Sequence, residues 1–221
     1  MGILEIDERI PSGIPDGGSG GVPGGKLRTP YPVADALMSV TQRRVLGLLF
    51  GEPDRAYFAT ELIALAEGGS GAVQRELARL VGAGLVTQHR VGNRKHYQAN
   101  PGSLVYPELR SLVRKAVLIP GAIATALDPV RDEVELALLH DAVPVAEGGR
   151  AAGIDLLLVS DSLSLDTARG LLAAAEARLG CPVDFSLCTG AEFRLRAARP
   201  NTVVARILAG PKIVVIGRLP E

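Results

Sequence analysis

Cysteine is scarce in this chain: Cys181 and Cys188 are the only two among 221 residues. Two cysteines are too few for a disulfide framework, and neither stands near other residues with metal-ligand spacing. They lie at either end of one predicted strand, too far apart to form a disulfide, so we interpret both as small core residues. The sequence therefore predicts reduced thiols and no metal held by them. We expect neither a metal nor a cofactor elsewhere in the chain.

Long apolar runs and a secretory signal are also missing. No window reaches the roughly 18 uninterrupted apolar residues that a membrane helix needs. The first ten residues, MGILEIDERI, carry acidic side chains where a secretory signal is basic. We therefore expect a soluble, cytoplasmic protein with no membrane partner.

Net charge is absent as well, because 24 Lys and Arg residues balance 24 Asp and Glu residues. This balance excludes a uniformly basic nucleic-acid coat protein and an acidic, disordered activator. The charges are nevertheless unevenly distributed. Residues 32–116 hold eleven basic and seven acidic side chains, whereas residues 117–221 hold ten basic and thirteen acidic ones. A basic middle and an acidic end predict two modules with different partners.

The first 31 residues contain eight Gly and four Pro. A chain of this composition has high conformational entropy when unfolded and little apolar surface to offset the cost of ordering. We therefore expect residues 1–31 to form a flexible tail.

Residues 32–103 carry the pattern of a small helical domain. Ser39 and Gln42 have the spacing of a capping box at the start of a first helix. Thr60 is expected to cap a second helix, and Ser70 a third. Each helix has apolar residues at helical spacing, which predicts one buried face on each.

A β-hairpin is predicted directly after the third helix. Residues 85–91 and 94–99 alternate like two strands, and Gly92-Asn93 between them is a tight-turn pair. Three helices followed by a basic hairpin is the element order of a winged helix-turn-helix domain, which binds DNA. The hairpin would be the wing.

The third helix has the residue types of a recognition helix. Its small leading residues let the backbone approach the major groove, Gln pairs with adenine, and Arg pairs with guanine or phosphate. The hairpin tip concentrates cations that suit the DNA backbone. The first helix adds two candidate phosphate contacts. The predicted DNA-binding residues are Arg43, Arg44, Ser70, Gly71, Ala72, Gln74, Arg75, Arg79, His89, Arg90, Asn93, Arg94, Lys95 and His96.

The stretch GAVQRELARLVGAGLVTQHRVGNRKHYQANP (Gly71–Pro101) resembles the winged-helix core of ArsR/MarR-like bacterial and archaeal regulators. The resemblance spans roughly residues 37–116. It implies sequence-specific binding of double-stranded DNA by a homodimer, because such regulators usually pair to match a palindromic site. A winged helix used only for protein contacts is the alternative interpretation.

A helical connector is predicted over residues 104–128, with interruptions at Pro107 and Pro120. Its Leu and Val residues exceed what one buried face needs, so we expect the homodimer contact there. From residue 129 to 221 the pattern changes to alternating strands and helices. The whole chain is therefore predicted to be α/β (α+β), with a mixed sheet in its second domain.

This last segment resembles the minimal nucleotidyltransferase domain of the polymerase-beta-like superfamily. The family pattern is a Gly-Ser loop after a strand, followed by Asp-x-Asp on the next strand, here IDLLLVS. Its backbone amides approach a triphosphate, and its carboxylates hold Mg²⁺. In this chain most of those positions differ. The resemblance places the remnant site at Asp141, Ala142, Gly153, Asp155 and Asp184.

The residues at these positions predict an inactive domain. Asp141 would put a negative charge beside the triphosphate, which costs on the order of 4 kcal/mol at about 4 Å and an effective dielectric near 20. Gly153 removes one of the paired carboxylates, while Asp155 and Asp184 remain as possible relics of the site or as polar strand ends. Asp141 acting as a substitute metal ligand is the alternative.

Together these patterns predict a DNA-binding transcriptional regulator whose degenerate nucleotidyltransferase-fold domain serves as a sensor, a dimer platform or a docking surface. A small molecule or a protein would be its effector. Two alternatives remain open. One is an active, Mg-dependent, antitoxin-like nucleotidyltransferase that regulates itself through its winged helix, and the other is a structural scaffold.

Overall fold

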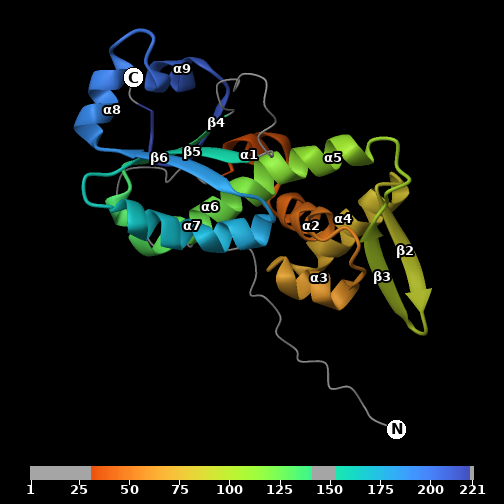
Figure 1. The fold of residues 1–221 in the computed structure, drawn as a ribbon. Helices are drawn as coiled ribbons and strands as arrows, with labels where there is room; N and C mark the ends of the chain where they lie inside the picture. The colour runs from red at the N-terminus through yellow and green to blue at the C-terminus, as the bar shows by residue number, and fades with distance from the viewer. Residues whose placement is uncertain (1–30, 141–152, 220–221) are drawn as a thin grey trace.

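The computed structural model describes residues 31–140 and 153–219 (Figure 1). It confirms the predicted α+β class. The helices are α1 (Pro32–Leu37), α2 (Val40–Gly51), α3 (Ala59–Leu65), α4 (Ser70–Gly82), α5 (Tyr106–Val113), α6 (Ile119–Leu127), α7 (Leu165–Leu179), α8 (Gly190–Ala197) and α9 (Val203–Ala209), with a π-helical turn at Arg114–Leu118 and a 3-10 helix at Asp128–Glu133. The strands are β1 (Tyr57–Phe58), β2 (Val86–Val91), β3 (Arg94–Ala99), β4 (Leu136–His140), β5 (Ile154–Val159), β6 (Val183–Cys188) and β7 (Lys212–Ile216).

The N-terminal unit, made of α1 to α4 and β1 to β3, has the predicted order of helices followed by a hairpin. The side chain of Ser39 accepts from the Gln42 amide, and the Gln42 side chain accepts from the Ser39 amide, so the predicted capping box is confirmed. The predicted caps at Thr60 and Ser70 are wrong by one or two residues. Phe58 and Gly69 hold the N-cap positions of α3 and α4 instead, and Ser70 is already helical.

One hydrophobic core holds this unit together. The helical spacing in α4 correctly predicts that Val73, Leu77 and Leu80 are buried. They pack with apolar residues of α2, α3 and the hairpin. Tyr31 is also buried in this core, although it was expected to belong to the flexible tail. The rest of that predicted tail lies outside the described residues.

The predicted connector is one continuous helical rod rather than a set of interrupted pieces. Pro107 stands in the first turn of α5, where no backbone N–H is needed. Pro120 falls inside the rod and cannot donate to a preceding carbonyl. The helix widens just before it into the π-turn, in which the Ile119 amide donates to the Arg114 carbonyl. The rod joins the two units, because Val113 and Val117 pack in the first core and Leu127 packs in the second.

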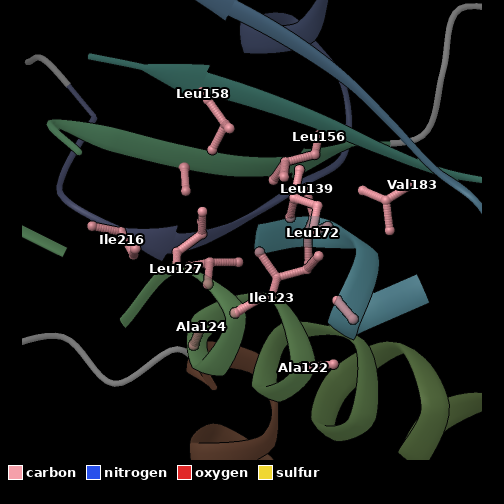
Figure 2. Packing of buried hydrophobic residues seen from close by; sticks show 14 of the residues in the cluster. Ala122, Ile123, Ala124, Leu127, Leu139, Leu156, Leu158, Leu172, Val183 and Ile216 are labelled. Atoms are coloured by element: carbon pink, nitrogen blue, oxygen red, sulfur yellow. The ribbon is translucent and has the colours of Figure 1, made fainter. Parts of the chain in front are cut away.

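The C-terminal unit, made of β4 to β7 and α7 to α9, is built on a mixed sheet with strand order β6-β5-β4-β7 among the described residues. β5 and β6 are parallel, whereas β4 is antiparallel to both β5 and β7. Because strand side chains alternate between faces, Leu156 and Leu158 pack toward α6 and α7, while Leu157 packs toward α8 and α9. Figure 2 shows the first of these layers, with Leu156 and Leu158 above Ile123 and Leu127 of α6.

Candidate nucleic-acid interface

The leading half of α4 presents polar and small side chains to solvent, as predicted. Ser70, Gly71, Gln74 and Arg75 are exposed, and Ala72 is half-buried. The Arg75 guanidinium lies over Gly71, since a Cβ at that glycine would be 3.3 Å from Arg75 Nη1. The surface is therefore flat at the start of the helix and carries one cation.

Arg79 faces outward, but its charge is already partnered. Its Nη2 donates to Glu76 Oε1 at 2.5 Å and its Nε donates to Glu76 Oε2 at 3.0 Å. Glu76 is buried and also accepts from Gln42 Nε2 at 3.3 Å. These contacts raise the pKa of Arg79, chiefly through the hydrogen bond to Glu76. Sequence spacing indicates an outward Arg79 but not this buried carboxylate, although the i,i+3 spacing of the two residues is a usable signal.

The hairpin tip, residues 89–96, concentrates cations in a short stretch of exposed backbone. Gly92 has φ +59°, which the tight turn requires and which glycine adopts without strain. Arg90 stands directly opposite Lys95, and Val91 stands opposite Arg94. Like charges directly opposite on neighbouring strands destabilise a hairpin. The pairing of Arg90 with Lys95 therefore lowers the stability of the hairpin tip.

The tip carries its charges on both faces, because successive strand residues alternate. His89 and His96 stand opposite one another, one step along the ladder from Arg90 and Lys95. His89 is exposed, as is Asn93 in the turn. His96 is half-buried, with its ring centroid 3.9 Å from that of Phe58, and its Nε2 is buried. We therefore withdraw His96 from the predicted contact set, since its ring packs against β1.

Arg43 and Arg44 do not fit the predicted role of phosphate contacts, because both are about 5% exposed. Arg43 pairs with Asp35, and its guanidinium lies 4.0 Å from the centre of the Tyr31 ring. Arg44 Nη1 donates to the backbone carbonyls at positions 66 and 67, at 2.9 and 3.0 Å. Arg43 therefore links α2 to α1, and Arg44 links α2 to the end of α3. We therefore remove them from the interface.

Four cations of the N-terminal unit differ from the remaining arginines of that unit, because they have no acidic partner among the described residues. Within residues 31–140 and 153–219, the ion pairs engage Arg43, Arg44, Arg55, Arg79, Arg194 and Arg196. None of them engages Arg75, Arg90, Arg94 or Lys95. Arg94 makes a cation–π contact with Phe58 at 5.3 Å instead. These four side chains are accessible and electrostatically uncompensated within the part of the chain that the structure describes.

The strand ends of the C-terminal sheet bring together part of the predicted remnant site. Asp155 on β5 is directly opposite Asp184 on β6 and opposite His140 on β4. Both aspartates are half-buried, and Gly153 is exposed. Asp141 and Ala142 lie outside the described residues. No group of three or more His, Cys, Asp or Glu suited to a metal ion occurs among residues 31–140 and 153–219.

The two cysteines are free thiols, as expected, and burial raises the pKa of Cys188. None of the helices in the two described segments is long and apolar enough to cross a bilayer. No protein-family model matches the chain, and no curated protein matches it.

Proposed function

We propose that this protein is a sequence-specific, DNA-binding transcriptional regulator. In this proposal α4 is the recognition helix of a winged helix-turn-helix domain, and the hairpin β2–β3 is its wing. One observation carries the proposal. The cations at the start of α4 and on the hairpin tip lack acidic partners among the described residues, whereas the arginines of α2 and the end of α4 are held by protein acceptors.

The position of these cations supports contact with a large polyanion. The hairpin extends from the body at the end of the molecule far from α8 and α9 (Figure 1). Arg90 and Lys95 sit side by side near its tip, so a phosphate between them would relieve their repulsion. Gln74 and Arg75 are exposed on α4, where they would read base edges. His89 and Asn93 complete the wing contacts in this proposal.

We propose a homodimer that pairs through α5, so that two recognition helices match a two-fold symmetric site. Leu104 just before α5 is 98% exposed, and Val105 and Leu112 are exposed as well. Apolar side chains that remain in water on a helix and just before it are typical of a protein contact. Light scattering coupled to gel filtration tests the pairing. A monomer at all concentrations up to about 100 µM would contradict it.

The C-terminal unit would then act as a sensor or platform with a degenerate nucleotidyltransferase fold. The alternative, an active Mg-dependent nucleotidyltransferase, is favoured by the placement of Asp155 directly opposite Asp184. A thermal-shift titration separates the two. Stabilisation by ATP only when Mg²⁺ is present, and its loss in Asp155→Ala, would support the enzyme.

The decisive test is selection of bound fragments from a random pool of duplex DNA, followed by gel shifts at two salt concentrations. With roughly three to five phosphate contacts per subunit, and so about six to ten in the proposed homodimer, affinity should fall about 10³- to 10⁵-fold between 50 and 200 mM salt. The variant Arg75→Ala/Arg94→Ala/Lys95→Ala should bind about 100-fold more weakly and show a shallower salt dependence.

The matched control removes three exposed arginines from the C-terminal unit: Arg169→Ala/Arg199→Ala/Arg206→Ala. It makes the same change in net charge far from the hairpin. It should bind DNA as the unmodified protein does. If Arg75→Ala/Arg94→Ala/Lys95→Ala bound DNA as tightly as this control, the proposed interface would be disproved.

A further inference from the structure

A groove of about 470 Å³ lies between the connector and one end of the strands of the C-terminal sheet. Its walls come from α1, from α5 and the π-turn, and from the ends of β4, β5 and β7 that lie nearest the connector. Both units of the protein therefore contribute to it. Its size falls within the range of pockets that bind small molecules.

The groove has an apolar lining that comes from α1, from the start of α6 and from the three strands. Val33 comes from α1, Ile119 from the start of α6, and Leu139, Ile154 and Ile213 come from three neighbouring strands. Burying apolar ligand surface against such side chains contributes about 25 cal/mol per Å². This lining suits a ligand with an apolar body.

Cationic side chains outnumber acidic ones around the groove. Arg114, Lys115 and Lys212 line it, against a single carboxylate from Asp155 among the described residues. Arg114 and Lys115 come from the basic segment 32–116, whereas Lys212 and Asp155 come from the acidic segment 117–221.

These cations are held by neutral groups. Arg114 donates to the Leu179 carbonyl at 3.3 Å and to Cys181 Sγ at 3.1 Å. Lys212 Nζ donates to the carbonyls of Leu208 and Gly210, at 2.6 and 3.2 Å. Lys115 is exposed, and no ion pair among the described residues engages it. None of these acceptors carries a formal charge. Three cations therefore stand against the single carboxylate of Asp155 among the described lining residues, and a net positive potential remains for a ligand.

The π-turn strengthens the case for a binding site. Such turns are uncommon in helices and often occur at functional sites. Here the turn begins with Arg114 and Lys115, and both residues line the groove. Pro120 explains why the helix widens at this point. The widened turn is also where two consecutive cationic residues line the same groove.

We propose that this groove binds a small organic anion, with an apolar body against the strands and a carboxylate or phosphate head group against Lys115 and Arg114. The ligand would bridge the connector and the C-terminal sheet. Binding itself does not depend on the proposed DNA-binding function. It supplies that function with a site at which an effector would act on both units.

The test is isothermal titration calorimetry of the full-length protein with octanoate and with octyl phosphate. These two anions share an apolar body and differ in the head group. Octanol is the neutral counterpart, and inorganic phosphate is the head group alone. We expect saturable binding of at least one of the two amphipathic anions, and the tighter one identifies the head group. Octanol and inorganic phosphate should each bind at least about tenfold more weakly.

Charge reversal locates the site. Lys115→Glu changes an exposed residue, so the variant should fold, and it should weaken binding of the anion at least about tenfold. Lys95→Glu on the hairpin makes the same change elsewhere and should leave anion binding unchanged while it weakens DNA binding. Absence of binding by both anions, equal binding of octanol, or an unaltered affinity in Lys115→Glu would each overturn the proposal. The two variants keep the two proposals separate. Anion binding is lost in Lys115→Glu if the groove proposal holds, and DNA binding is lost in Lys95→Glu if the interface proposal holds, so either proposal can fail without the other.

Discussion

The two sheets in the described part of the chain differ in how far their side chains are buried. The mixed sheet of the C-terminal unit is covered on both faces, so neighbouring residues such as Leu157 and Leu158 are both buried. The hairpin of the N-terminal unit is buried only near its base, at Val86, Tyr97 and Ala99, and beyond that point Val91 is 63% exposed. Packing therefore explains the apolar residues of the mixed sheet. It does not explain why the hairpin tip carries cations. Residues that packing does not require are the better guide to function.

Truncation of an apolar side chain should separate the two sheets most strongly. Leu158→Ala removes a fully buried side chain from the mixed sheet and should lower the free energy of unfolding by about 2–5 kcal/mol. Val91→Ala makes a similar change on the hairpin and should lower it by less than about 0.5 kcal/mol. Urea denaturation measures both. A large loss of stability in Val91→Ala would show that the hairpin tip is packed.

Loss of charge should show the reverse contrast. Arg90→Ala/Lys95→Ala removes a like-charged pair, so stability should stay the same or rise slightly, while DNA affinity falls about 100-fold. His89→Ala/Arg94→Ala changes two side chains one step along the ladder, on the other face of the hairpin, and removes one arginine where the first variant removes an arginine and a lysine. Gel shifts with the two variants show which face contacts the duplex. Tight binding by both would remove the wing from the proposed interface.

Within the N-terminal unit, buried and exposed arginines should differ in the same way. Arg44→Ala leaves one buried and one part-buried carbonyl without their donor and should cost about 1–3 kcal/mol of stability. Arg75→Ala should leave stability unchanged and weaken DNA binding about tenfold. Denaturation and gel shifts on the same two proteins test this pair. Similar stability losses in both variants would mean that Arg75 also has a structural role.

Alkaline pH should act on the N-terminal unit, because all four tyrosines belong to it or to the first turn of α5. Burial, with Glu52 adding to it, raises the pKa of Tyr57 to about 12. The unfolded chain loses this proton near pH 10, whereas the folded protein retains it to about pH 12. The stabilisation is therefore complete below pH 10 and disappears as the pH rises to 12.

The urea midpoint, measured from pH 8 to 12, should fall over the upper part of this range. Tyr57→Phe removes the ionisable group and should make the fall shallower. At neutral pH the two proteins should differ little, which makes this the smallest expected effect. An equally steep fall in the variant would show that another group causes the alkaline loss.

Local sequence signals predicted most of the element order. The capping box at Ser39 and the spacing of Val73, Leu77 and Leu80 depend on residues within a few positions of each other, so they can be recognised without the rest of the fold. The bounds of β3 were predicted to the residue. The continuous rod across Pro120 was not predicted, since a π-turn has no clear sequence signal.

For the candidate interface, the amino-acid types alone identified a basic helix start and a basic hairpin tip, because charge and turn chemistry are properties of short segments. Only the tertiary structure decided which cations are free to bind. Arg43 and Arg75 look equivalent as residues, but Arg43 is held by Asp35 and Tyr31, and Arg75 has no acidic partner among the described residues. The groove beside the connector likewise exists only in three dimensions, because α1, the π-turn and three strand ends meet there from distant parts of the chain. Burial and ion pairing depend on such long-range contacts, and these arise only when the chain has folded.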